Sequence, residues 1–407
     1  MNHCGCIIIG GSHAAAQLAV SLRQEGWQEP ITVISDASSL PYQRPPLSKG
    51  FLAQKVTADK LLIRPPALYE TNQIDFRLQQ VVSAVDPVNK QVTLANGECL
   101  AYSKLAFCTG ARVRRIEICG ADAKGIHYLR DLQDVVGLQQ ALTGSQQIVI
   151  VGGGYIGLET AASLRQLGHS VTVIEAAPRL LQRVTAPAVS EYFQRLHEAN
   201  GVTIVTQKQV AEFVTAESGV VTQVLCTDGS TYPADLVIVG IGVRPNLELA
   251  QAAGLECADG IVVDEYARTA DPDIVAAGDC AQHPLPYYDQ LKRLESVPNA
   301  MEQAKVAAAT LCGKSKPYQA LPWFWSDQYQ TKLQIAGLNS GYDKTVIRGD
   351  QTTHNFSVWY FHEQRLLAVD CINQPKDFML AKALISQNKA IDQSQLSDLD
   401  FDLKTWL

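Results

Sequence analysis

The chain has 407 residues, more than one ordinary domain usually holds, which indicates two or three domains. Hydrophobic residues make up 46% and charged residues 18%, a composition typical of a folded protein and not of a disordered one. A net charge of −7 without any basic run argues against nucleic acid or an anionic membrane as a partner. The chain also lacks an apolar run of about 18 residues, the length that predicts a membrane-spanning helix.

Ten cysteines are scattered along the chain without the repeated spacing of metal ligands. The start, MNHCGCIIIGG, lacks the basic region, separate apolar stretch and cleavage site of a secretory signal. We therefore expect a cytoplasmic protein with free thiols. Cys4 and Cys6 fall on one face of an expected strand, where simple packing is the main interpretation and a metal site or disulfide is the alternative.

An internal repeat is the most informative feature of the chain. Residues 7–26, IIIGGSHAAAQLAVSLRQEG, align with residues 149–168, VIVGGGYIGLETAASLRQLG. Each copy predicts a buried strand, a glycine-rich turn and a helix, followed by a second strand that leads to an acid, Asp36 or Glu175. In such a βαβ unit the turn and the helix N-terminus receive a pyrophosphate, and the acid accepts hydrogen bonds from a ribose. One match would be weak evidence, but two ordered copies predict two dinucleotide sites.

The two turns differ in their glycines. The second copy has all three glycines of the fingerprint, Gly152, Gly154 and Gly157. The first copy has Gly10, Ser12 and Ala15 at the same positions. Alanine is an accepted variant where the helix packs on the strand, whereas the Cβ of Ser12 must fit beside the phosphates.

Two further strands are expected to end at a ligand. LAFCTGA ends in Thr109 and Gly110, and DIVAAGD ends in Gly278 and Asp279. Each alone can be an ordinary strand end. Together they fit a flavin site in which Gly278 permits close approach and Asp279 accepts hydrogen bonds from ribityl hydroxyls. Residues 235–246, between these segments, predict a strand that returns from the second βαβ domain to the first.

Five longer blocks are more specific than the glycines. They are PYQRPPLSKGFL (41–52), VGGGYIGLE (151–159), AAGDCA (276–281), LESVPNAMEQA (294–304) and PWFWSDQY (322–329). In these blocks the chain resembles the FAD-dependent pyridine nucleotide reductases with two dinucleotide-binding domains. Among them it is most similar to the putidaredoxin reductase-like ferredoxin reductases of oxygenase systems, and the resemblance spans nearly the whole chain.

The resemblance implies an α/β fold with two Rossmann-like dinucleotide-binding domains in a glutathione reductase-like three-layer arrangement, plus a C-terminal α+β domain. We expect an FAD-binding domain over 1–112 and 243–320, an NADH-binding domain over 113–242 and a C-terminal domain over 321–407. In this last domain alternating aromatic and polar residues predict an antiparallel sheet, closed by a helix around 377–386.

The resemblance also implies the cofactors FAD and NADH and the residues that hold them. The FAD residues are Gly10, Ser12, His13, Ala14, Ala15, Asp36, Arg44, Lys49, Val82, Thr109, Gly110, Arg130, Gly278, Asp279, Ser296, Val297 and Trp325. The NADH residues are Gly152, Gly153, Gly154, Tyr155, Ile156, Gly157, Glu159, Glu175 and Gly242. Glu175 would accept from the ribose 2′-OH and repel a 2′-phosphate, which favours NADH, although Arg179 and Arg183 weaken this preference.

Two candidate catalytic residues follow from the chemistry. Nicotinamide gives up two electrons together and an iron–sulfur cluster accepts one, so a flavin is required between them. The resemblance puts Lys49 near flavin N5, where its charge would stabilise the reduced flavin, with Glu159 as its counter-ion. A solvated lysine and a helix-surface acid are the alternatives. The block at 41–52 contains no cysteine, which argues against a dithiol relay and a cysteine-based peroxidase.

The expected partner is a [2Fe–2S] ferredoxin, bound transiently by a monomer or weak homodimer and feeding a cytochrome P450 or Rieske-type oxygenase. Because such ferredoxins are acidic, docking onto this negative chain needs clustered cations. Candidates are Arg64, Lys292, Arg293, Lys314, Lys316, Lys332 and Lys344, with Trp325 as the apolar element. For each cation an ordinary surface position is the alternative. Two other functions stay open: an NADH oxidase, and an apoptosis-inducing-factor-like flavoprotein that controls assembly.

Overall fold

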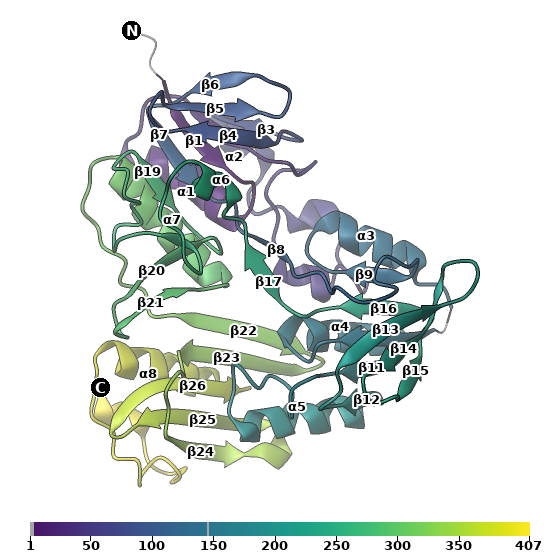
Figure 1. The fold of residues 1–407 in the computed structure, drawn as a ribbon. Coiled ribbons are helices and arrows are strands. Elements are labelled where there is room, and N and C mark those ends of the chain that lie inside the picture. Colours follow the sequence, from purple (N-terminus) through teal and green to yellow (C-terminus); the bar gives the residue numbers. More distant parts are fainter. Residues whose placement is uncertain (1–3, 145) are drawn as a thin grey trace. The chain divides into compact units, whose positions relative to one another are not determined.

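The computed structural model describes residues 4–144 and 146–407, which form two compact units. The first unit holds the chain up to Gln43, Asp59–Arg112 and Arg244–Pro322. The second holds Arg44–Ala58, Val113–Val243 and Trp323–Leu407 (Figure 1). Within the described residues, no helix is both long enough and apolar enough to cross a membrane.

A five-stranded parallel sheet forms the centre of the first unit, in the order β19-β7-β1-β2-β3. Its strands are β1 (Cys6–Ile9), β2 (Ile31–Ile34), β3 (Ile74–Arg77), β7 (Lys104–Phe107) and β19 (Ile274–Ala276). Helix α1 (His13–Glu25) connects β1 to β2, as the crossover of a parallel pair requires. Both faces of the sheet are covered, which explains why β1 is a continuous apolar run and why β2, with the sequence ITVI, departs from one only at Thr32.

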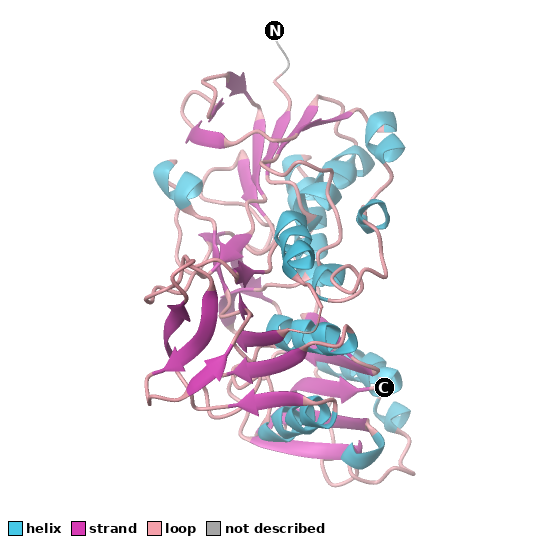
Figure 2. Cartoon of the chain, turned by 90° about the vertical axis from the view of Figure 1, so that its right-hand side faces the viewer, coloured by secondary structure: helices cyan, strands magenta, loops and turns pink. Residues whose placement is uncertain are grey.

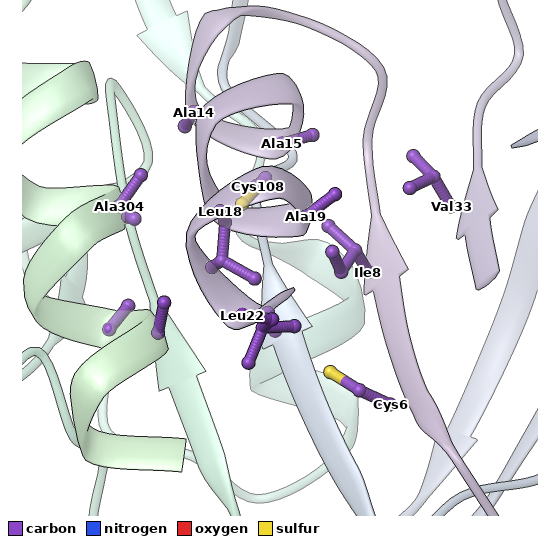
Figure 3. Close-up of a cluster of buried hydrophobic side chains, with 14 of the residues drawn as sticks. Cys6, Ile8, Ala14, Ala15, Leu18, Ala19, Leu22, Val33, Cys108 and Ala304 are labelled. Atoms are coloured by element: carbon purple, nitrogen blue, oxygen red, sulfur yellow. The ribbon is translucent and has the colours of Figure 1, made fainter. Parts of the chain in front are cut away.

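The two faces of this sheet bury two clusters of side chains. Cys6 and Ile8 point toward α1 and α7 (Val297–Leu311), and Ile7 and Ile9 point the other way. Figure 3 shows α1 and Ala304 of α7 in the first cluster. The second cluster lies under α6 (Glu248–Ala252) and the antiparallel meander of β4 (Val82–Asp86), β5 (Gln91–Leu94) and β6 (Cys99–Ala101). Helices, parallel sheet and meander are the three layers that the sequence predicts.

The second unit repeats this plan with a parallel sheet in the order β12-β11-β10-β16-β9. Its strands are β9 (Ile126–Tyr128), β10 (Gln147–Val151), β11 (Ser170–Ile174), β12 (Val202–Val205) and β16 (Leu236–Val239). Helix α4 (Tyr155–Gln166) connects β10 to β11, and α5 (Pro187–Ala199) connects β11 to β12. A meander of β13 (Val210–Thr215), β14 (Val221–Cys226) and β15 (Thr231–Pro233) packs on one face.

The C-terminal part of the second unit is an antiparallel sheet in the order β22-β23-β26-β25-β24. Its strands are β22 (Trp323–Gln328), β23 (Thr331–Gly337), β24 (Lys344–Asp350), β25 (Asn355–His362) and β26 (Arg365–Ile372). Helix α8 (Pro375–Ser386) packs on β23 and β26. This sheet and helix confirm the α+β fold expected after residue 321 (Figure 2). The division into three domains remains our proposal.

The remaining elements are short. They are α2 (Pro66–Thr71), α3 (Leu132–Ala141), β8 (Ala111–Val113), β17 (Val243–Pro245), β18 (Ile261–Val262), β20 (Ala281–Leu285), β21 (Gln290–Arg293) and the 3₁₀ turns Pro45–Ser48, Ala58–Leu61, Gln351–Thr353 and Leu403–Trp406.

Candidate cofactor and active site

In the first unit the predicted FAD residues follow the carboxyl ends of neighbouring strands. Gly10 follows β1, Asp36 follows β2, Thr109 follows β7 and Gly278 follows β19. Because these strands are all parallel, their carboxyl ends meet at one edge of the sheet, the edge where α/β sheets bind ligands. The structure therefore brings these four positions together.

The first glycine-rich turn has the geometry of a phosphate site. Gly10 has a φ of +115°, and a Cβ there would lie 2.1 Å from the carbonyl oxygen of Cys108, so only glycine fits. The chain then enters α1, whose first turn, His13–Ala16, contains no acidic residue. The positive end of the helix dipole is thus available for the pyrophosphate of FAD.

Other predicted FAD residues of the first unit lie around this turn or at the start of an element. A Cβ on Gly278 would lie 3.1 Å from the Cβ of Ala14, which places the end of β19 against the start of α1. Ser296 is the N-cap of α7 and accepts from the backbone N–H of Asn299, and Val297 is the first residue of that helix. Val82 is buried at the start of β4.

The second unit presents the same arrangement for NADH. Gly152 follows β10, Glu175 follows β11 and Gly242 lies beyond the end of β16. Gly152 has a φ of +111°, and a Cβ on it would lie 2.4 Å from the carbonyl oxygen of Gly240. A Cβ on Gly157 would lie 2.2 Å from the carbonyl oxygen of Gly152, so α4 packs directly on the turn.

The carboxylate of Glu175 is fixed at the end of β11. Its Oε2 accepts from the backbone N–H of Gly153 at 2.6 Å, and its Oε1 accepts from that of Ala177 at 2.7 Å. Arg179 is already bonded to the segment that follows it, because it donates to the carbonyl oxygen of Thr185 at 2.8 Å and to Oγ of Ser190 on α5 at 2.5 Å. The carboxylate is therefore fixed at the predicted ribose position, and one of the two nearby arginines is already bonded.

Lys49 and Glu159 form a partly buried ion pair. Lys49 Nζ donates to Glu159 Oε2 at 2.6 Å and to the carbonyl oxygen of Pro45 at 3.1 Å. Ser48 Oγ donates to the same Oε2 and Ser326 Oγ donates to Oε1, both at 2.6 Å. The side chain of Glu159 is 2% exposed and that of Lys49 is 21% exposed. Glu159 is therefore not a helix-surface acid, and Lys49 is not an ordinary solvated lysine.

Three more predicted FAD residues belong to the second unit. Arg44 Nη1 donates to the carbonyl oxygen of Arg130, at 2.6 Å, just beyond the end of β9. Trp325 is half-buried on β22, and its ring centroid lies 5.6 Å from that of Trp323. The predicted FAD residues are thus divided between the units, with Arg44, Lys49, Arg130 and Trp325 in the second and the rest in the first.

Several of the predicted docking cations already have acidic or polar partners. Arg293 is 10% exposed, donates to Glu295 at 2.6 Å and lies 3.5 Å from Asp259. Four other cations have partners: Lys314 and Lys316 both bind Glu25, Arg64 donates to Gln17, and Lys332 lies 3.9 Å from Asp327. Lys292 is half-buried and Lys344 is exposed. Arg293 is built into the first unit and is a poor candidate for a mobile docking charge.

The sequence analysis did not select three serines that the structure places at the sites. Ser48 and Ser326 bind Glu159, and the only signal for them was their presence in the blocks at 41–52 and 322–329. Ser35 directly follows β2 as Glu175 directly follows β11, so Asp36 lies one residue beyond the position equivalent to Glu175.

Two parallel sheets, each with a glycine-rich turn at its carboxyl edge, together with a buried lysine–carboxylate pair, define an oxidoreductase that binds two nucleotides. Residues 5–304 match the family model described as "Pyridine nucleotide-disulphide oxidoreductase", and residues 323–407 match "Reductase C-terminal". The chain belongs to the pyridine nucleotide-disulphide oxidoreductase family. Family membership confirms the predicted resemblance and the cofactors FAD and NAD(H).

Similar proteins cover nearly the whole chain. It is 42% identical over 402 residues to putidaredoxin reductase CamA of Pseudomonas putida, covering 98% of this chain and 95% of that protein. It is 40% identical over 404 residues to the ferredoxin–NAD(+) reductase component of an anthranilate 1,2-dioxygenase system of Burkholderia cepacia, covering 98% of each. The reductase chain solved in a covalent putidaredoxin reductase–putidaredoxin complex superposes with a TM-score of 0.96 at 42% identity, covering 98% of this chain and 97% of that one.

Proposed function

We propose that the chain is an NADH-dependent flavoprotein reductase that passes electrons from NADH through FAD to a [2Fe–2S] ferredoxin, which serves a cytochrome P450 or Rieske-type oxygenase. The observation that carries the proposal is the ion pair of Lys49 and Glu159, built onto the helix that follows the NADH turn. The names of the similar proteins, reductases of ferredoxins and of putidaredoxin, support it.

The protein's part in this reaction is to orient the cofactors and to place charge. FAD, when bound, would supply the chemistry that takes two electrons from NADH together and releases them one at a time. In our proposal the Lys49 ammonium faces the flavin and stabilises the negative charge that develops on reduction. Glu159 holds this ammonium, and its own two oxygens are held by Ser48 and Ser326. The charge is therefore positioned before the reaction begins.

Glu175 and the second glycine-rich turn account for a preference for NADH. The helix N-terminus at Tyr155 would receive the pyrophosphate of NADH, and the fixed carboxylate of Glu175 would accept from the ribose 2′-OH. A 2′-phosphate would be repelled by this charge. Arg179, bonded to Thr185 and Ser190, would have to break these bonds to compensate.

A direct transfer from flavin to ferredoxin fits the cysteines better than a thiol relay. Cysteine is missing from the block at 41–52, although the family name refers to disulphides. Cys280 is the thiol next to Asp279, and burial raises its pKa, as it does that of Cys108. These thiols stay protonated and unreactive at neutral pH. All ten cysteines lie within the described residues, and none forms a disulfide there. The cytoplasm remains our proposed location.

The test is NADH oxidation in air with and without a [2Fe–2S] ferredoxin. We expect rapid turnover only with the ferredoxin, and expect that step to slow between low and moderate salt while flavin reduction by NADH barely changes. Equal turnover without ferredoxin would favour an NADH oxidase.

Lys49→Met keeps bulk and removes charge, so it should slow flavin reduction more than it weakens FAD binding. For docking, Lys344→Glu is a cleaner test than reversal of Arg293, which would break two ion pairs.

A further inference from the structure

A continuous chain of side-chain hydrogen bonds runs inside the second unit from Tyr329 to Glu159. Tyr329 OH lies 3.3 Å from His197 Nδ1, and His197 Nε2 lies 2.8 Å from Gln328 Oε1. Gln328 Nε2 donates to Ser326 Oγ at 3.1 Å, and Ser326 Oγ donates to Glu159 Oε1 at 2.6 Å. His197 and Ser326 are fully buried, and Gln328 and Glu159 are 1% and 2% exposed. Polar groups this deep are stable only when bonded, and each is bonded to the next.

The direction of every bond follows from the groups at its ends. The carboxylate of Glu159 can only accept, so Ser326 donates to it and in turn accepts from the amide of Gln328. The carbonyl oxygen of Gln328 also only accepts, so His197 carries its hydrogen on Nε2. Burial lowers the pKa of His197 to about 4, so the ring is neutral at pH 7 and Nδ1 accepts from Tyr329. Every donor therefore points toward Glu159.

The two oxygens of Glu159 are held from different parts of the fold. Oε2 is bound by Ser48 and Lys49, which lie in and just after the 3₁₀ turn at Pro45–Ser48. Oε1 is bound by Ser326 of β22. From Ser326 the hydrogen bonds continue through Gln328 to His197 of α5. Aligned hydrogen bonds polarise and strengthen one another, so this chain opposes rotation of the carboxylate. Loss of one link would release Oε1 while leaving Lys49 and Glu159 in the protein.

We propose that Ser326, Gln328 and His197 are positioning residues for electron transfer from NADH to the flavin. They fix the carboxylate of Glu159 and, through it, the ammonium of Lys49. The inference rests on the proposed function and deepens it, because none of these three residues lies in either glycine-rich turn. Their effect should be seen in the properties of the flavin and not only in the stability of the fold.

A second hydrogen-bond cluster in the same unit provides a matched control. Tyr192 of α5 bonds Thr331 of β23 at 3.1 Å and His354 at 2.8 Å. This cluster joins α5 to the C-terminal sheet, as the hydrogen-bond chain to Glu159 does, but its three members include no carboxylate. Thr331→Val thus removes a buried hydroxyl without touching the chain that ends at Glu159.

The experiment compares Ser326→Ala with Thr331→Val in the FAD-loaded full chain. Three quantities are measured for each: the free energy of unfolding, the stopped-flow rate of flavin reduction by NADH, and the flavin reduction potential. We expect similar losses of stability. Ser326→Ala should slow flavin reduction about tenfold, which matches one hydrogen bond to a charged group, and shift the potential to more negative values. Thr331→Val should leave the rate and the potential unchanged.

Equal rates and equal potentials for the two variants would overturn the inference and make the chain purely structural. If Ser326→Ala does not fold, Gln328→Met is compared with Thr331→Val instead. This variant removes both hydrogen bonds of the Gln328 side-chain amide and keeps the side chain nearly the same length. A wild-type flavin that NADH does not reduce would overturn the proposed function itself, which distinguishes that failure from failure of the inference.

Discussion

The two βαβ repeats have the same fingerprint pattern, but their turns need glycine at different positions. Gly10 and Gly152 both have positive φ and both approach a carbonyl oxygen of the neighbouring strand end. At the third position Gly157 meets the carbonyl oxygen of Gly152, whereas the first repeat accommodates the Cβ of Ala15. The three fingerprint glycines are therefore not equivalent: the first is required by the chain in both repeats, and the third only in the second.

The acids of the two repeats also have different roles. The Ser35 hydroxyl accepts from the backbone N–H of Ala37 at 3.2 Å, as Glu175 accepts from Ala177. The segment between the SLRQ sequence and the second strand has six residues in the first repeat and three in the second. Asp36 is the second residue after β2, one residue beyond the position equivalent to Glu175, and is exposed. In the second repeat a single carboxylate stabilises the turn and is also the predicted ribose acceptor, whereas in the first repeat Ser35 bonds the turn and Asp36 is the predicted acceptor.

The helices of the repeats differ in the same way at one buried position. Glu159 of α4 aligns with Gln17 of α1, and each binds a cation from a separate segment. Gln17 Oε1 accepts from Arg64 at 3.3 Å, and Glu159 accepts from Lys49 at 2.6 Å. Only the second repeat places a charged pair there, which is why we assign the electrostatic role to it.

The largest expected effect is that of Gly157→Ala. The added Cβ would lie 2.2 Å from a backbone oxygen that cannot move aside, so α4 must shift away from β10. We expect a loss of about 3 kcal/mol in the free energy of unfolding, measured by urea denaturation, with weakened NADH binding. The control Ala15→Gly should cost only about 1 kcal/mol, the usual penalty for glycine in a helix. Equal losses would show that the third position is the same in both repeats.

The next effect is that of Glu159→Gln, which makes the second helix resemble the first at this position. The amide keeps the size but loses the charge that holds Lys49, so flavin reduction by NADH should slow about 30-fold, or by about 2 kcal/mol. Stopped-flow reduction under anaerobic conditions measures this rate. The matched variant Gln17→Met should leave the rate near that of the wild type. A similar slowing in both variants would contradict a special role for the charged pair.

A smaller effect is expected for Glu175→Ala. The loss of the carboxylate removes both the acceptor for the ribose and the charge that repels a 2′-phosphate. We expect kcat/KM for NADH to fall about tenfold, or by about 1.4 kcal/mol, and kcat/KM for NADPH to rise because the repelling charge is gone. Steady-state kinetics with both nucleotides measure the change in preference. An unchanged NADH-to-NADPH ratio would show that Glu175 only stabilises the turn, as Ser35 does.

Sequence reasoning predicted the fold because the repeat combines local signals: apolar strands, glycine turns and helices in a fixed order. Neither the position of Ser35 nor that of Asp36 relative to Glu175 could be predicted, because it depends on the pairing register of two distant strands. The same limit applies to the hydrogen-bond chain from His197 to Glu159, whose directly bonded members are separated by up to 167 residues in the sequence. For the same reason Arg293 was predicted to be a docking cation. Its pairing with Asp259 depends on a contact that is made only in the folded unit.

The smallest effect is expected for Gly154→Ser, which gives the second turn the residue that the first has at Ser12. Gly154 is the N-cap of α4 with φ −82° and ψ 179°, an extended conformation open to any residue. Apart from Gly154 itself and its neighbours along the chain, no heavy atom of the described residues lies within 4 Å of a Cβ at this position. Because serine is a good N-cap, the free energy of unfolding should change by less than about 0.5 kcal/mol. The KM for NADH should rise no more than about threefold, or about 0.7 kcal/mol.

Loss of stability would mean that the chain itself needs glycine here. A tenfold rise in KM at unchanged stability would mean that the pyrophosphate passes closer to this turn than to Ser12, and the two repeats would then differ in how tightly each holds its nucleotide.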